Sequence, residues 1–434
     1  MATDAVLVFS SIFLGSAVLV AWNIVRQLYL PDPNRPPVVF HWFPLIGSTI
    51  SYGIDPYKFF SDCQAKYGDC FTFYLLGSPT TVFLGTKGNE FILNGKLRDL
   101  NAEDVYGPLT TPVFGKGVVY DCPNSKFMDQ KRLLTPGLSG AALKTYVPMF
   151  VKEAEEFIRT SPIFKAKTGI CDISSVMAEI TTYTAAGSLQ GREIRERLDT
   201  EVSILYRHLD DGFAPINFVF PWLPIPRNIR RNHAQRTMAQ LYLDVLQRRR
   251  LQNKQEGEED MLDILIRSTY RDGSPIPDIE IANLMIALLM GGQHNTSSTG
   301  SWIVLRLAHD PALIEELYQE QLKVLGPSLP PLTYNHIQAL TLHNNMIKET
   351  LRLHSPIHSV MRKVKTTMVV PETNWAIPPS HTLLAAPGFL GTRSGIRIGG
   401  TTQMLVLYPM LLLLPKSLHR TIKTPLTTGL EPSH

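Results

Sequence analysis

IANLMIALLMGGQHNTSSTGSWIV, residues 281–304, contains no Lys, Arg, Asp or Glu. At about 1.5 Å of rise per residue, a helix of this length could cross a bilayer. However, residues 293–299 are seven consecutive polar residues. They would lie at the bilayer centre, where unsatisfied polar groups are costly. We therefore predict a helix that runs through the core of a large soluble body.

Two glycines precede the polar run of this helix. Gly291 and Gly292 would let a ligand approach the backbone closely, and the neighbouring hydroxyls would supply hydrogen bonds. The alternative is that Ser and Thr bond back to the preceding turn and bend the helix. A histidine such as His294 is by itself more often a core residue than a catalytic one. The residues alone leave these alternatives open.

A second helix, in the stretch KETLRLHSP (348–356), carries Glu349 and Arg352 three residues apart. An isolated pair at this spacing is by default a weak surface ion pair. The apolar neighbour Leu351 favours instead a buried pair held by further groups.

Two histidines near the end of that helix suggest a zinc site only at first sight. His354 and His358 are four residues apart, but Pro356 between them breaks the helix that would align their rings. We predict no metal site made of protein side chains.

The N-terminal 30 residues are predicted to form a membrane anchor. Residues 5–25 carry no formal charge, and Trp22 and Arg26 are typical interfacial residues at the far end of a span. A cleaved signal peptide is the alternative, but the stretch lacks a basic leading region. The charges after the span favour a cytosolic body. Residues 31–37 are a proline-rich hinge, and the folded body begins near Val38.

Two further elements are clearly marked in the sequence. The runs 71–75 (FTFYL) and 80–84 (TTVFL), separated by Gly77-Ser78-Pro79, predict a β-hairpin. Asp310-Pro311 and Gly326 predict the start and end of a helix. Helices dominate the rest of the chain, and residues 252–260 (QNKQEGEED) are predicted to form a solvated loop.

The composition excludes several classes of protein. With 434 residues, 44% of them apolar and 18% charged, the chain is neither fibrous nor disordered. A net charge of +4 is too weak to predict nucleic acid as a partner. The four cysteines, Cys63, Cys70, Cys122 and Cys171, are too few and too irregularly spaced for a disulfide framework, so we expect thiols.

Residues 394–434 differ in composition from all that precedes them. They contain four Lys or Arg and one acid, with an apolar run at 404–414 that Pro409 interrupts. This run is too short for a membrane span.

The order of these features resembles a microsomal cytochrome P450: an anchor, a proline hinge, a hairpin, a long helix with GGQH, and an ExxR motif at 349–352. Two segments, 106–131 (YGPLTTPVFGKGVVYDCPNSKFMDQK) and 206–224 (YRHLDDGFAPINFVFPWLP), are more specific, and resemble fungal sterol 14α-demethylases. The resemblance covers residues 1 to about 393. It implies a mainly helical cytochrome P450 fold with small β-sheets, an N-terminal transmembrane helix, and a C-terminal part that is incomplete.

The resemblance also implies roles for individual residues. Tyrosine hydroxyls and cations would hold the propionates of a haem cofactor; these residues are Tyr106, Tyr120, Lys131 and Arg362. Asp210 and His294 would form the ion pair that gates proton delivery to the site of oxygen activation. Glu349 and Arg352 would be structural. An apolar sterol cavity would be lined by Phe114, Val119, Phe213, Gly291, Ile357 and Ser359.

The sequence departs from the family pattern at two places. Asn295 stands where the family usually has a threonine, so either oxygen activation differs or Thr296 substitutes. After the segment 386–393 (APGFLGTR), the loop FxxGxxxCxG, which supplies the axial thiolate to the haem iron, is missing, and the last cysteine is Cys171. We interpret residues 394–434 as the product of a frame change, a retained intron or a truncated gene model.

The sequence therefore predicts a sterol 14α-demethylase-like haem monooxygenase of ergosterol biosynthesis, whose domain covers residues 38–393. By the same resemblance it would use O₂ and electrons from an NADPH-cytochrome reductase, and lie on the endoplasmic reticulum membrane with its body in the cytosol. The alternative is a non-catalytic, membrane-anchored protein that binds a sterol or a partner, or a truncated product. The missing cysteine favours this alternative.

Overall fold

The computed structural model describes residues 2–165, 169–197, 200–252 and 260–391. Two predictions fall on other residues and lie outside this range: the tail 394–434 and most of the loop at 252–260. The chain divides into two compact units. Among the described residues, unit 1 comprises 2–109, 215–221 and 357–391, and unit 2 comprises the described residues of 110–214 and 222–356. Each unit is considered separately.

Unit 1 is built on a five-stranded sheet with the order β1-β2-β7-β4-β3. β2 pairs with β7 in parallel, and the other neighbours are antiparallel. A separate two-stranded ribbon joins β5 (Met368–Val369) and β6 (Ala376–Ile377). The bounds of the five strands are Cys70–Leu75 (β1), Ser78–Phe83 (β2), Leu100–Asn101 (β3), Val360–Val364 (β4) and Thr382–Ala385 (β7).

The predicted hairpin is confirmed as β1 and β2, but its turn was predicted at residues 77–79 and lies at residues 76–77. Leu76 and Gly77 form the turn with φ of 49° and 77°. Two consecutive residues with positive φ match the twist of the flanking strands. Pro79 therefore lies inside β2, where it pairs with Tyr74.

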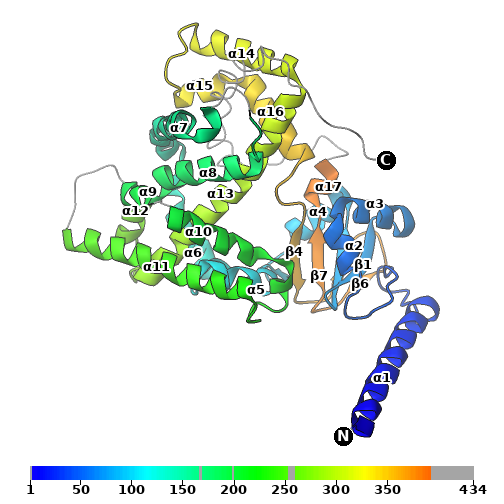
Figure 1. The fold of residues 1–434 in the computed structure, drawn as a ribbon. Helices are drawn as coiled ribbons and strands as arrows, with labels where there is room; N and C mark the ends of the chain where they lie inside the picture. Colours follow the sequence, from blue (N-terminus) through cyan, green and yellow to red (C-terminus); the bar gives the residue numbers. More distant parts are fainter. Residues whose placement is uncertain (1, 166–168, 198–199, 253–259, 392–434) are drawn as a thin grey trace. The chain divides into compact units, whose positions relative to one another are not determined.

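Helices α2, α3, α4 and α17 of unit 1 pack beside this sheet, whereas α1 projects away from it (Figure 1). Aromatic side chains from α3 and the hairpin, including Phe60, Phe71 and Phe73, form the buried core between them. The unit contains α1 (Ala2–Tyr29), α2 (Thr49–Ile54), α3 (Pro56–Tyr67), α4 (Gly85–Leu93), η6 (Pro215–Phe218), α17 (Pro387–Gly391) and the first part of α5 (Glu103–Phe114).

The N-terminal segment is helical, as predicted, and ends at Tyr29. Among the described residues, no helix combines the length and the apolar character that crossing a bilayer requires. The end of α1 is tied to unit 1 by side-chain amides, since Asn23 and Gln27 both donate to the carbonyl of His41, at 3.0 and 2.9 Å.

Unit 2 is helical, and α13 (Asp278–His309) lies at its centre. α13 packs against α8, α11 and α16, and its first half is buried in the largest apolar cluster of the described residues. The other elements are η1 (Val119–Asp121), α6 (Asn124–Leu134), η2 (Pro136–Leu138), α7 (Gly140–Thr160), η3 (Pro162–Phe164), α8 (Ile173–Ala185), η4 (Ala186–Gln190), α9 (Arg192–Glu196), α10 (Thr200–Asp210), η5 (Asp211–Phe213), α11 (Pro226–Gln252), α12 (Met261–Arg267), α14 (Pro311–Leu325), α15 (Tyr334–Ala339) and α16 (Thr341–Leu353).

The helix predicted after Asp310 is confirmed as α14. The Asp310 side chain caps it by accepting the N–H of Leu313 at 3.1 Å, and Pro311 opens its first turn. Gly326 ends it with φ of 88°.

Candidate functional site

The polar interruption of α13 bonds back to the preceding turn and also borders a hollow. The hydroxyl of Thr296 donates to the carbonyl of Gly292 at 2.6 Å, so back-bonding to the preceding turn does occur. Asn295 does the same through its amide, which donates to the carbonyl of Gly291 at 3.2 Å. At the same time, Gly291, Gly292 and Thr296 line a hollow in unit 2.

This first hollow has a volume of about 340 Å³. α6, η4 and α13 supply most of its wall, which is apolar apart from Gln130, Lys131 and Thr296. Lys131 is the only charged residue of the lining. The lining residues are Val119, Phe127, Gln130, Lys131, Leu134, Leu138, Ala185, Leu189, Leu284, Ala287, Leu288, Gly291, Gly292 and Thr296. Four of the predicted site residues, Val119, Lys131, Gly291 and Thr296, are therefore brought together.

The cation of this hollow lies against an aromatic ring. Lys131 Nζ is 4.4 Å from the centroid of Phe127. The ring of Tyr120 lies 5.4 Å from the same Phe127 ring. No carboxylate within the described parts of the chain forms an ion pair with Lys131, so its charge remains available to an anionic group.

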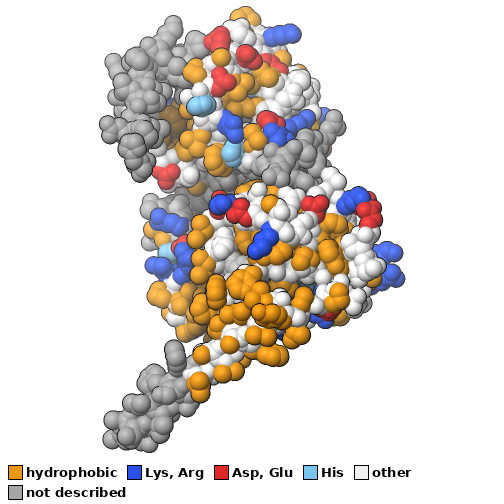
Figure 2. All heavy atoms as spheres, turned by 90° about the vertical axis from the view of Figure 1, so that its right-hand side faces the viewer, with side chains coloured by type: hydrophobic (Ala, Val, Ile, Leu, Met, Phe, Trp, Pro, Cys, Tyr) orange, Lys and Arg blue, Asp and Glu red, His pale blue; other side chains and the backbone are white. Residues whose placement is uncertain are grey.

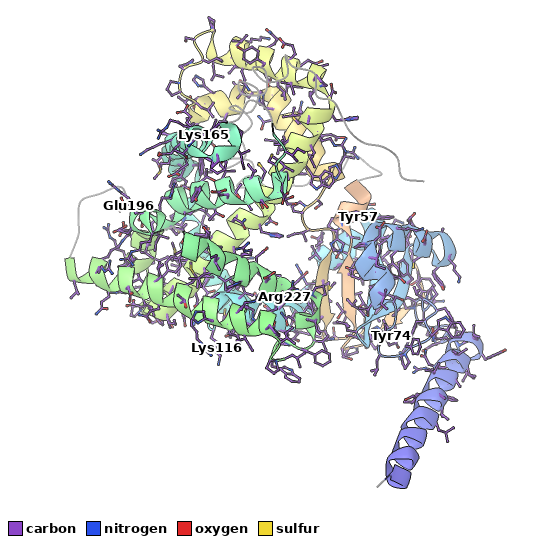
Figure 3. All side chains as sticks on the ribbon, viewed as in Figure 1. Tyr57, Tyr74, Lys116, Lys165, Glu196 and Arg227 are labelled. Atoms are coloured by element: carbon purple, nitrogen blue, oxygen red, sulfur yellow. The ribbon has the colours of Figure 1, made fainter. Side chains whose placement is uncertain are left out.

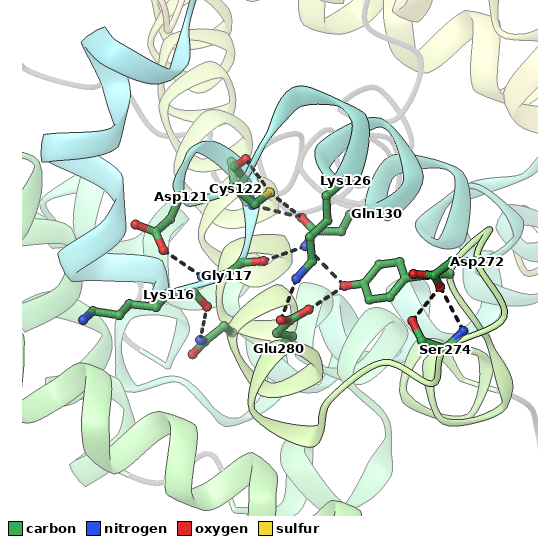
Figure 4. Close-up of polar contacts among 12 residues, drawn as sticks. Lys116, Gly117, Asp121, Cys122, Lys126, Gln130, Asp272, Ser274 and Glu280 are labelled. Carbon is green, nitrogen blue, oxygen red and sulfur yellow. Dashed lines mark hydrogen bonds and ion pairs between the residues drawn. The ribbon is translucent and has the colours of Figure 1, made fainter.

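A buried glutamine, Gln130, holds the loop that carries Val119 and Tyr120 (Figure 4). Its Oε1 accepts the backbone N–H of Val119 at 3.0 Å, and its Nε2 donates to the carbonyl of Gly117 at 2.9 Å. Nε2 also donates, more weakly, to the Tyr270 hydroxyl at 3.4 Å. Val119 needs this support because its φ is 55°, which a β-branched residue rarely adopts.

Sequence reasoning missed Gln130. A signal was present, because Gln130 lies between Phe127 and Leu134 at helical spacing, on the stripe of α6 that faces the hollow. An amide at such a position requires partners. Its partners are backbone groups of a loop, and these are not visible in a sequence pattern.

The predicted pair Asp210 and His294 lies at the end of α10 and in the middle of α13. His294 Nδ1 is 3.2 Å from Asp210 Oδ1. The hydrogen bond to Asp210 raises the pKa of His294 above its ordinary value, against a smaller lowering by burial. Both side chains are substantially exposed, by 59% and 44%, so solvent screens the interaction. Neither residue is part of the lining of the first hollow.

Two predicted substrate residues, Phe114 and Phe213, contact each other instead of lining this hollow. Their ring centroids are 5.8 Å apart with an interplanar angle of 62°, and both pack against the main apolar cluster of unit 2. Core packing, the usual role of such rings, describes their position.

The remaining predicted ligand-binding residues lie in unit 1. The Tyr106 hydroxyl accepts the N–H of Met361 at 2.8 Å, and burial raises the pKa of Tyr106, which keeps it a neutral donor. Arg362 donates to the carbonyl of Met361 at 2.8 Å. Ser359 is buried with its Oγ 3.2 Å from the Tyr52 hydroxyl, whereas Ile357 is half exposed.

Glu349 and Arg352 form an ion pair, with Arg352 Nε donating to Glu349 Oε2 at 2.8 Å. The burial that we expected is absent for the acid, because the Glu349 side chain is 55% exposed, against 23% for Arg352. The pair lies on the outer side of the short helix α16, whose buried stripe is formed by neighbours such as Ile347 and Leu351.

Comparison with known proteins identifies the family to which the chain belongs. Residues 36–392 match the family cytochrome P450. The chain is 61% identical over 366 residues to sterol 14-alpha demethylase CYP51C of Gibberella zeae, an alignment that covers 84% of this chain and 71% of the relative. It is 56% identical over 372 residues to eburicol 14-alpha-demethylase of Uncinula necator, with coverage of 85% and 71%.

Among solved structures, the retinoic acid bound cyanobacterial CYP120A1 has a similar fold. The TM-score is 0.69 at 17% sequence identity, and the match covers 83% of this chain and 79% of that one. At this identity the match concerns the fold alone. It agrees with the predicted mainly helical architecture with small sheets.

Proposed function

Because the chain belongs to the cytochrome P450 family, and within it to the sterol 14-alpha demethylases, we propose that it holds a haem beside a sterol, which are the cofactor and the substrate of the oxidative removal of a sterol's 14α-methyl group. The observation that carries this proposal is the first hollow. It combines an apolar wall and one lysine with the two glycines of α13.

Haem is the cofactor of this family, and the lining of the first hollow suits the chemistry of this group. A flat apolar macrocycle with two carboxylates suits an apolar hollow whose cation pairs with no carboxylate of the described residues. In unit 2, Lys131 and Tyr120 would hold one propionate. In unit 1, Arg362 and Tyr106 offer the same chemistry, since a guanidinium and a buried phenol both donate to carboxylates.

The cysteines of the chain do not fit the position of an axial ligand. Haem in this family is held by a cysteine thiolate, on which its oxidative chemistry depends. Burial raises the pKa of Cys63 to about 11 and that of Cys70 to about 12, which keeps both as neutral thiols in unit 1. Cys122 donates to the carbonyl of Val119 at 3.4 Å, and Cys171 is exposed. None of the four lines the first hollow.

We therefore assign to this chain's own residues the tasks of binding, orientation and proton transfer. The apolar lining excludes water from a sterol, and Val119 presents its side chain to the hollow. Asp210 orients the His294 ring through Nδ1 and stabilises its protonated form, so His294 can hold a proton at the surface of α13. Thr296 is the hydroxyl that faces the hollow, although it is bonded to Gly292.

We also propose that the protein acts on a membrane, where the sterol is found and where a reductase would supply electrons. The support is the uncharged run 5–25, together with an apolar surface of unit 1 near the end of α1. Hydrophobic side chains gather over this surface in Figure 2; they include Trp42, Phe43, Leu45, Ile46, Ile50 and Ile54, all well exposed. An exposed apolar patch of this kind marks an interaction surface. By family, the membrane would be the endoplasmic reticulum.

The test of the sterol assignment is equilibrium binding of dehydroergosterol, a fluorescent sterol, to the detergent-solubilised full chain, with lanosterol as competitor. Val119→Trp should fill the hollow and weaken sterol binding by about tenfold or more, because the sterol would lose apolar contacts equivalent to roughly one side chain. Leu251→Trp, at an exposed position of α11, is the matched control. Equal affinities for the two variants would refute the assignment of the hollow to sterol.

A further inference from the structure

Unit 2 contains a second hollow, which is open to solvent and has polar or charged side chains at seven of its eleven lining positions. Its volume is about 590 Å³, and it shares no lining residue with the first. It lies between the turn after α5, the first half of α11 and the first turns of α13; Lys116 from that turn is labelled in Figure 3. The lining comprises Thr111, Pro112, Gly115, Lys116, Gly117, Asn232, Gln235, Arg236, Ile279, Glu280 and Asn283.

Hydrogen bonds hold several residues of this hollow in place. Asn283 Nδ2 donates to the carbonyl of Lys116 at 2.9 Å, while Asn283 Oδ1 accepts from Gln235 Nε2 at 3.1 Å. Gly115 makes this arrangement possible, because a Cβ there would lie 2.3 Å from the Asn283 side chain, and because its φ is 99°. The backbone of the turn and two amides are thus held in place before any ligand arrives.

The acid of this hollow is already neutralised. Glu280 Oε1 accepts from Lys126 Nζ at 2.7 Å, and Glu280 Oε2 accepts from the Tyr270 hydroxyl at 2.6 Å. Both oxygens are engaged, and the carboxylate is largely buried.

The two cations of this hollow, in contrast, are not neutralised. Lys116 and Arg236 are both exposed, and neither forms an ion pair with any residue that the structure describes. The flanking part of α11, residues 226–237, contains four arginines and no acid; of these arginines, Arg227 pairs with Asp211 and Arg231 is buried. Asn232 also lines the hollow and carries an amide that can donate.

We propose that this second hollow binds a phosphate group, carried by a soluble phosphate monoester or by the headgroup of an anionic lipid. A guanidinium presents a planar fork that matches phosphate oxygens, and a lysine adds a point charge. The volume leaves room for an organic group beside the phosphate. The inference does not depend on the proposed function, because no residue of the haem and sterol site takes part.

The experiment uses the detergent-solubilised full chain and two probes at fixed ionic strength, glycerol 3-phosphate and the water-soluble dioctanoyl phosphatidic acid. Uncharged dioctanoylglycerol is the control for apolar binding. The variant is the double substitution Lys116→Ala and Arg236→Ala, and the matched control is Arg230→Ala, an exposed arginine of α11 outside the hollow. Circular dichroism and melting temperature establish that all variants fold.

We expect the double substitution to weaken phosphate binding by at least about tenfold, because two charge-assisted hydrogen-bonding groups are removed, whereas Arg230→Ala should bind as the wild type does. If the wild type binds both probes and the double variant binds neither, a soluble monoester is sufficient. If the wild type binds only the phosphatidic acid and the double variant does not, the phosphate group comes from a lipid headgroup. Absence of binding to both probes, or equal binding by the wild type and the double variant, would overturn the proposal.

Discussion

Gln130 accepts the backbone N–H of Val119 at 3.0 Å, and through this bond helix α6 sets the position of a loop residue that faces the first hollow. The same side chain donates to the carbonyl of Gly117, so two backbone groups of one loop depend on one buried amide. An apolar replacement would leave both groups without a partner.

We predict that Gln130→Leu lowers the free energy of unfolding by about 2–4 kcal/mol, since each buried polar group left unsatisfied costs roughly 1–3 kcal/mol. It should also weaken sterol binding, because Val119 would relax from its positive φ. Urea denaturation measures the first effect and dehydroergosterol titration the second. Gln240→Leu, which removes an exposed amide bonded to Asp244, is the control. If Gln130→Leu lost no more stability than the control variant, Gln130 would not be the residue that positions this loop.

The contact between Asp210 and His294 predicts a pH dependence. Because the pKa of His294 is raised in the folded state above its ordinary value of 6.5, the pair contributes stability that is fully present below that value. This contribution is lost as the pH rises through the folded-state pKa. Asp210→Asn should therefore destabilise the protein at acidic pH and have little effect once His294 is neutral in the wild type.

The measurement is the NMR titration of the His294 ring, in parallel with denaturation at several pH values. Asp211→Asn is the matched control, since Asp211 interacts with Arg227, which stays charged throughout. A pKa of His294 that is the same in the wild type and in Asp210→Asn would contradict the assignment.

Membrane attachment is predicted to depend on the N-terminal residues. The full chain should fractionate with microsomes, and deletion of residues 1–30 should release most of it, because about 21 uncharged residues suffice for a bilayer span. The apolar surface around Trp42 and Leu45 should retain a salt-resistant fraction. Replacing both residues with serine in the deleted chain should release this fraction. Recovery of the folded, undeleted chain in the high-speed supernatant would argue against the anchor.

The positions of the four cysteines predict the spectrum of the haem-loaded chain. None lines the first hollow, and two are buried neutral thiols. With haem supplied and reduced, the carbon monoxide difference spectrum should therefore lack a thiolate-type Soret band. A chain with all four cysteines replaced by serine should give the same spectrum. A thiolate-type band in the wild type that disappears in this variant would show that one of these cysteines reaches the iron.

The sequence correctly predicted the helices that are marked by neighbouring residues in the chain. The helix after Asp310 begins and ends where its cap residues place it, and α13 is the buried helix that its uncharged, interrupted pattern indicates. The hairpin was found but its turn was misplaced, since Gly77-Ser78-Pro79 has turn composition while the backbone turns at Leu76–Gly77. The amino-acid composition of a turn does not reveal the φ values that set the register of its two strands.

Tertiary relationships were predicted less well. Glu349 was expected to be buried because leucines surround it in sequence, but on α16 those leucines point to a different side. Gln130 was missed because its partners are backbone groups of a loop. The rings of Phe114 and Phe213 contact each other, which the sequence did not indicate, while their predicted role in lining a sterol cavity stays a prediction. In each case the deciding contact comes from outside the local sequence window.

The hollow lined mainly by α6 and α13 is proposed to accept haem, with Lys131 at its edge. The most direct test is Soret absorbance titration of the full chain with haemin. We compare the wild type with Lys131→Ala, Gly292→Phe and Leu305→Phe. A Cβ at Gly292 would meet only Leu189, at 3.8 Å, so a phenylalanine fits the helix while filling the hollow. Leu305 is exposed on the same helix. We expect saturable binding of one haem per chain in the wild type and in Leu305→Phe, weaker binding in Lys131→Ala, and none in Gly292→Phe. Equal binding by all four chains, or no saturable binding by the wild type, would contradict this proposal.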